Sequence, residues 1–89
     1  MQFEWDPNKA ASNLATHGVD FEEALVVFSD PHRFVAEDKR KDYGETRINT
    51  TGKADALLVV TVTHTDRDGI TRLISARPAS RKERKKYHG

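Results

Sequence analysis

A few side chains in the second half of the chain could carry acid–base and phosphate chemistry without a metal. They are the imidazole of His64, the guanidinium groups of Arg47 and Arg77, and the phenol of Tyr87. Cleavage of RNA by its own 2′-hydroxyl needs a base for that hydroxyl, an acid for the leaving oxygen and cations for the phosphorane. We expect His64 to act as base or acid, and Tyr87 to donate a proton or stack on a base. The two arginines would clamp the phosphate.

Each of these residues also has a structural explanation. A histidine on a strand is often half-buried and hydrogen-bonded to a neighbouring strand, and His64 could be one of these. Arg47 and Arg77 could form surface ion pairs with Glu45 and Glu83, which is the commoner role for an arginine taken singly. Both explanations stay open at the level of sequence.

The charge distribution favours a phosphate-bearing ligand. The net charge is only +1, but residues 1–45 hold 5 Lys/Arg and 10 Asp/Glu, whereas residues 46–89 hold 10 Lys/Arg and 4 Asp/Glu. A basic half of this kind suits nucleic acid, although a solvated surface of mixed sign has the same composition. The cations that we expect to contact RNA are Lys9, His17, Arg72, Arg81, Arg84 and Lys85.

Several classes of site are not expected from the sequence. There is no cysteine, and the histidines at 17, 32, 64 and 88 lack the spacing of metal ligands, so we predict no metal and no cofactor. No Gly-rich phosphate loop or Ser-His-Asp signature is present. The longest apolar run, Ala56–Val60, is too short to cross a membrane, and the N-terminus is unlike a signal peptide. These features predict a cytoplasmic protein with no membrane contact.

Local signals predict two helices in the first third of the chain. Asp6 and Pro7 begin a helix that runs to about Thr16 and stops at Gly18. A second helix begins at Asp20 and ends at the Asp-Pro pair of residues 30–31. In the first helix, the apolar positions expected to face inward are Ala10, Ala11 and Leu14. The polar positions expected to form a stripe are Lys9, Asn13 and His17.

The remainder of the chain predicts a sheet and a terminal helix. The predicted strands, from weak to strong, are Phe3–Trp5, Phe34–Val35, Glu45–Thr51, Ile70–Arg77 and Leu57–Thr65. Residues 66–69 form a hairpin turn, and a capping box at Ser80 and Glu83 opens a short basic helix. The 89 residues therefore form one domain, 1–89, of the α+β class. Two N-terminal helices pack on one face of a three- to four-stranded antiparallel sheet, and a short C-terminal helix follows.

The hairpin register decides which residues share a face with His64. A loop of two or four residues places His64 on the face of Arg77, whereas a loop of three residues aligns it with Arg72. The sequence leaves both registers open. The face away from the N-terminal helices is expected to be uncovered and is the place to look for function.

The chain resembles the BrnT toxin family, part of the wider RelE-like group of toxin nucleases. The matching residues are Phe3–Pro7, Lys9, Asn13, His17–Val19, Phe21–Ala24, Phe28, Asp30–Pro31, Glu45, Arg47, Gly52, Leu57–Val60, His64–Thr65, Arg67, Ile74–Arg77, Ala79, Glu83–Arg84 and Tyr87. Two positions depart from the family pattern: Thr16 stands where a basic residue often precedes the His-Gly pair, and the usual isoleucine before Gly52 is missing.

The resemblance implies a RelE-like fold and an endoribonuclease that inhibits translation. It also implies a BrnA-type antitoxin that neutralises the toxin in a hetero-oligomer, expected to be a heterotetramer. Promoter DNA would be bound only through the antitoxin. The alternative is a non-catalytic module that binds nucleic acid or the antitoxin without cleaving RNA.

Overall fold

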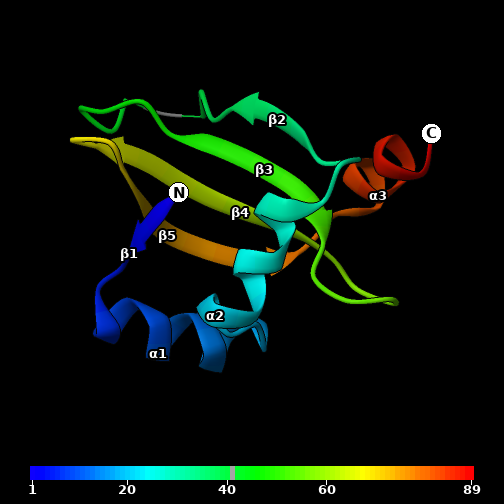
Figure 1. The fold of residues 1–89 in the computed structure, drawn as a ribbon, viewed down its shortest axis with the longest axis horizontal. Helices are drawn as coiled ribbons and strands as arrows, with labels where there is room; N and C mark the ends of the chain where they lie inside the picture. Colours follow the sequence, from blue (N-terminus) through cyan, green and yellow to red (C-terminus); the bar gives the residue numbers. More distant parts are fainter. Residues whose placement is uncertain (41) are drawn as a thin grey trace.

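The computed structural model describes residues 1–40 and 42–89. It is an α+β fold in which a twisted sheet separates the N-terminal helices from the C-terminal helix (Figure 1). In chain order the elements are β1 (Gln2–Glu4), α1 (Pro7–His17), α2 (Phe21–Ala24), the 3-10 helix η1 (Leu25–Ser29), β2 (Phe34–Glu37), β3 (Ile48–Lys53), β4 (Val59–Arg67), β5 (Ile70–Pro78) and α3 (Arg81–His88).

The described strands form one five-stranded mixed sheet in the order β1-β5-β4-β3-β2. The prediction of a three- to four-stranded antiparallel sheet was therefore wrong in strand number and in strand direction. The Phe34 segment joins the sheet as its weak strand signal predicted, but β1 adds a fifth strand at the edge and runs parallel to β5, with Phe3 opposite Thr71. The pairing of β1 with β5 leaves no local sequence pattern, because the paired residues lie far apart in the chain and β1 has only three residues.

Helix α1 forms where its local signals predict. The Asp6 side chain accepts a hydrogen bond of 2.8 Å from the Asn8 N–H, and Gly18 ends the helix in the left-handed conformation with φ of 70°. Its buried face differs in part from the expectation. Ala10 packs against the core as predicted, but Asn13 is buried and Leu14 is 49% exposed, because Asn13 rather than Leu14 meets the edge of β5.

The second helix is short and changes type. Helix α2 ends at Ala24 and η1 continues the chain with a tighter turn. The fully buried side chains of this segment, Phe21, Ala24 and Val27, lie three residues apart. This spacing is that of a 3-10 helix, in which residues i and i+3 lie above one another, so packing selects the tighter turn.

The hydrophobic core lies between the sheet and the N-terminal helices. The inward side chains of β4 and β5 include Val60, Val62 and Leu73, each at most 1% exposed. They pack with Phe21 and Val27 in one cluster. Burial of this apolar surface supplies most of the driving force for a sheet that two such short helices could not support alone.

The other face of the sheet, which we call the open face, carries the alternate residues of the same strands. Helix α3 lies over one end of it. The Ser80 and Glu83 capping box of α3 forms as predicted, and the Lys86 ammonium sits 4.8 Å from the centre of the Phe34 ring on β2. No helix in the described ranges is long and apolar enough to span a membrane.

Candidate nucleic-acid interface

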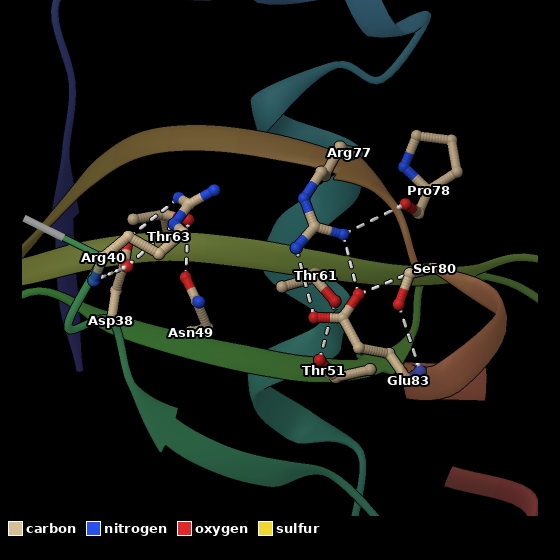
Figure 2. Close-up of polar contacts among 10 residues, drawn as sticks. All are labelled: Asp38, Arg40, Asn49, Thr51, Thr61, Thr63, Arg77, Pro78, Ser80 and Glu83. Carbon is tan, nitrogen blue, oxygen red and sulfur yellow. Dashed lines mark hydrogen bonds and ion pairs between the residues drawn. The ribbon is translucent and has the colours of Figure 1, made fainter. Parts of the chain in front are cut away.

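A row of hydroxyl and amide side chains forms the floor of the open face (Figure 2). The Thr51 and Thr61 hydroxyl oxygens are hydrogen-bonded at 2.7 Å, and the Thr63 hydroxyl donates to Asn49 Oδ1 at the same distance. Three of these side chains are buried, and Thr61 is 0% exposed. The floor is therefore polar and ordered, with its hydroxyl groups bonded to one another and to Asn49.

An arginine–glutamate pair stands on this floor beneath α3. Arg77 donates from Nη1 to Glu83 Oε1 at 2.7 Å and from Nη2 to Oε2 at 3.1 Å. The Ser80 N–H donates to Oε1 at 2.8 Å (Figure 2), and the Thr61 hydroxyl adds a further hydrogen bond to the carboxylate. The bonds from Arg77, above all, hold the pKa of Glu83 at about 2, against the opposing effect of burial.

A hollow adjoins this pair between α3 and β2. The residues that line it are Phe34, Ala36, Asn49, Thr51, Lys82, Glu83 and Lys86. Lys82 and Lys86 bring two positive charges to the rim, against the single negative charge of Glu83, and the rest of the lining is neutral. This combination fits an anionic ligand.

A second arginine lies further along the open face, where the chain enters β3. Arg47 precedes Asn49 by two residues and so points to the same face. Its guanidinium stacks on the Tyr43 ring at 3.9 Å from the centroid, and its ion pair with Glu45 is long, at 3.7 Å. Arg47 Nε is buried without a hydrogen-bond partner among the described residues, so this guanidinium keeps an unused donor.

A third ion pair flanks the floor in the loop after β2. Arg40 donates from Nε and Nη2 to the two oxygens of the buried Asp38, both at 2.9 Å (Figure 2). Hydrogen bonds from Arg40 are the main reason why the pKa of Asp38 falls to about 2. The pair fixes the loop beside the Asn49 and Thr63 end of the floor.

His64 lies on the helix side of the sheet and does not meet Arg77. A bulge between Thr63 and His64 shifts the register, so that His64 pairs with Leu73 while Thr61 pairs with Arg77. The two-residue turn that would place His64 and Arg77 on one face does form. The bulge, however, reverses the alternation of side chains between His64 and Arg77, so the two lie on opposite faces. His64 Nε2 is 2.8 Å from the Thr50 hydroxyl oxygen, and burial lowers the pKa of the imidazole. This is the half-buried histidine, hydrogen-bonded to a neighbouring strand, that was the structural alternative.

Tyr87 anchors α3 to the body of the domain. Its hydroxyl donates to Asp30 Oδ2, which also accepts the Lys53 N–H at 2.8 Å. The hydrogen bond to Asp30 is the main cause that raises the pKa of Tyr87 to about 12. Burial alone would raise the pKa of Asp30, but the bonds from Lys53, Tyr87 and His32 lower it to about 2. The phenol is engaged away from the arginines of the open face.

The other predicted RNA contacts do not form one patch. Lys9 and His17 line a separate hollow along α1, and Arg72 is paired with Glu4 next to β1. Arg81 and the later cations Arg84 and Lys85 are exposed on α3. Only the α3 group adjoins the open face.

Comparison with known families identifies the chain. The sequence model described as ribonuclease toxin, BrnT, of type II toxin-antitoxin system matches residues 5–83. The protein belongs to the BrnT family. Among solved structures it is similar to the ribonuclease toxin BrnT of Brucella abortus, with 26% identity, a TM-score of 0.72, and coverage of 91% of this chain and 99% of that one. No curated protein sequence matches significantly.

Membership of the BrnT family makes the chain the ribonuclease-toxin member of a type II system and implies an antitoxin partner. Sequence reasoning missed most of the polar floor that this role can use. The overlooked residues are Asn49, Thr51, Thr61 and Thr63. A signal was present: threonine at 61, 63 and 65 alternates with valine at 60 and 62, which is typical of a strand with one polar face.

Proposed function

We propose that this BrnT-family toxin is a metal-independent endoribonuclease of RelE-like fold that inhibits translation by cleaving RNA on its open face. The observation that carries the proposal is the position of Arg77 beside the hydroxyl row of Thr51 and Thr61, under the basic helix α3. A planar guanidinium binds two phosphate oxygens at once, and the hydroxyls can donate to the same group.

The chemistry follows from these groups. The 2′-hydroxyl of RNA attacks the adjacent phosphorus as its proton passes to water, and the bond from phosphorus to the 5′-oxygen breaks as that oxygen takes up a proton from water. The negative charge that builds on the phosphorane oxygens is stabilised by fixed donors. Arg77 and Arg47 are the guanidinium groups of the open face best placed to supply them. His64 and Tyr87 lie outside this face, so we assign the phosphate contacts to the two arginines. His64 and Tyr87 support the site by holding the sheet and α3 in place.

The test is cleavage of a defined RNA by the purified protein in the presence of a metal chelator. We expect products that end in a 2′,3′-cyclic phosphate or a 3′-phosphate. Arg77→Ala should reduce the rate at least about tenfold, because a bidentate contact to a charged group is lost. Arg67→Ala, which removes an arginine at the far end of β4, is the matched control. Loss of activity on chelation, or an unchanged rate in Arg77→Ala, contradicts the proposal.

We further propose that the partner is a BrnA-type antitoxin, that the two chains form a heterotetramer, and that promoter DNA is contacted through the antitoxin. The basic open face and α3 would attract acidic groups of the partner. Light scattering of the co-expressed pair measures the stoichiometry, and growth arrest without the neighbouring gene, relieved with it, tests neutralisation. RNA binding without cleavage and without growth arrest would instead favour a non-catalytic binding module.

A further inference from the structure

The Glu83 carboxylate is held by an unusually complete set of donors for a side chain near the surface. Arg77 contributes two, the Ser80 N–H a third and the Thr61 hydroxyl a fourth. These donors converge on the two oxygens of one carboxylate, and Figure 2 shows the bonds from Arg77 and Ser80. A tetrahedral phosphate presents its oxygens to an arginine fork in the same bidentate manner, so these donors form a cradle for either anion.

We infer that Glu83 masks a phosphate-binding cradle made of Arg77, Thr61 and the Ser80 N–H, and that a phosphate of the RNA displaces the Glu83 carboxylate on binding. The inference rests on the proposed RNA-cleaving function for the identity of the phosphate. The free toxin then holds its own anion in the binding site, and substrate must compete with it.

The geometry allows this exchange without loss of the fold. The side chains of Arg77 and Glu83 keep 31% and 22% of their surface exposed, so a ligand can reach the pair from solvent. Tyr87 and Lys86 tie the last turns of α3 to Asp30 and Phe34, so α3 stays attached while the Glu83 side chain rotates. Lys82 and Lys86 at the rim of the adjoining hollow attract the incoming phosphate.

Glu83 has a purely local role that must be separated from masking. It completes the capping box of α3, because its carboxylate accepts the Ser80 N–H while the Ser80 hydroxyl accepts the Glu83 N–H at 3.1 Å. Glutamine serves at this position of a capping box as well as glutamate. Glu83→Gln therefore keeps the cap through its amide oxygen, while it removes the negative charge and one of the two oxygens that accept from Arg77.

The test compares Glu83→Gln with Glu4→Gln, a neutralisation of equal charge in the ion pair with Arg72, outside the open face. The probes are inorganic phosphate and a 2′-O-methyl RNA oligonucleotide, which binds but cannot be cleaved. We expect Glu83→Gln to bind both probes about tenfold more tightly than the parent, since a charge-assisted competitor is removed. Glu4→Gln should gain less than about twofold from general electrostatics. Adding Arg77→Gln to Glu83→Gln should abolish the gain.

Equal gains in the two single variants, or a gain that survives without Arg77, would overturn the masking role. Tighter binding of the oligonucleotide without any effect of inorganic phosphate would also overturn it, because the cradle itself would then not be the phosphate site. If Glu83→Gln does not fold, phosphate is titrated into the parent protein while the Arg77 side-chain N–H signals are followed by NMR. Signals that stay fixed contradict displacement. If the protein binds the probes as expected but cleaves no RNA, the phosphate-binding cradle is supported and the proposed nuclease activity is contradicted.

Discussion

The side-chain amide of Asn13 takes the place of a neighbouring strand at Ala76 of β5. Asn13 Oδ1 accepts the Ala76 N–H at 3.0 Å, and Asn13 Nδ2 donates to the Ala76 carbonyl at 2.7 Å. Strand β1 pairs with β5 only over residues 70–72, so this part of the edge would otherwise leave its peptide groups unpaired. A third bond, from Nδ2 to the Val19 carbonyl at 3.0 Å, ties the same amide to the turn after α1.

Replacement of Asn13 should therefore be costly. Asn13→Leu leaves the buried peptide groups of Ala76 without partners, and we expect a loss of about 3 kcal/mol in the free energy of unfolding. Asn13→Asp should also destabilise, because a carboxylate cannot donate to the two carbonyls. Urea denaturation measures both. Asn8→Leu, in the exposed first turn of α1, is the control, and a loss below about 1 kcal/mol for Asn13→Leu would show that water replaces the amide.

The role of Asn13 illustrates which parts of the fold can be predicted from sequence. The caps of α1 and α3 and the hairpin turn at Asp68 and Gly69 are confirmed because each depends on residues close together in the chain. The polar stripe that contains Asn13 was recognised by its helical spacing. Its partner Ala76 is 63 residues away, and no local pattern connects the two.

The candidate site was less predictable for a related reason. Arg77 could be picked out by its chemistry and Glu83 was correctly named as its possible partner. Whether His64 and Arg77 share a face depends on one bulge, since an extra residue in β5 reverses the alternation of side chains beyond it. Bulges have weak sequence signals, so the expected meeting of His64 and Arg77 could not have been excluded without the structure.

Burial of His64 predicts a pH dependence of stability. The folded state has a lower pKa for this imidazole than the value near 6.5 of the unfolded chain, so the unfolded state takes up a proton first as the pH falls. The free energy of unfolding should be insensitive to His64 above about pH 7.5 and should decline as the pH drops below about 6.5. Denaturation midpoints across this range measure the effect.

The matched variant for this prediction is His64→Gln, whose side chain can still bond to the Thr50 hydroxyl but does not titrate. We expect its stability to be flatter between pH 7.5 and about 5 than that of the parent. His17→Gln, which replaces an exposed histidine on α1, is the control for the substitution itself. An equal slope in the parent and in His64→Gln would contradict a buried neutral imidazole.

The hydrogen bond between Tyr87 and Asp30 is expected to hold α3 against the body of the domain. Tyr87→Phe removes the hydroxyl that holds the last turn of the helix, and Asp30 keeps only its backbone donors. Amide hydrogens of α3 should then exchange faster, while those of β4 keep their protection, because the core does not involve Tyr87.

Acid should act on α3 in the same direction as Tyr87→Phe. Because the pKa of Asp30 is low, its contribution to stability is complete above about pH 4 and is lost as the pH falls toward about 2. Since α3 also carries Glu83 and the basic rim of the site, Tyr87→Phe should weaken binding of a 2′-O-methyl RNA oligonucleotide, whereas Tyr43→Phe, outside α3, should leave the exchange of α3 unchanged. Unaltered exchange in Tyr87→Phe would mean that the capping box and the Arg77 pair alone hold the helix in place.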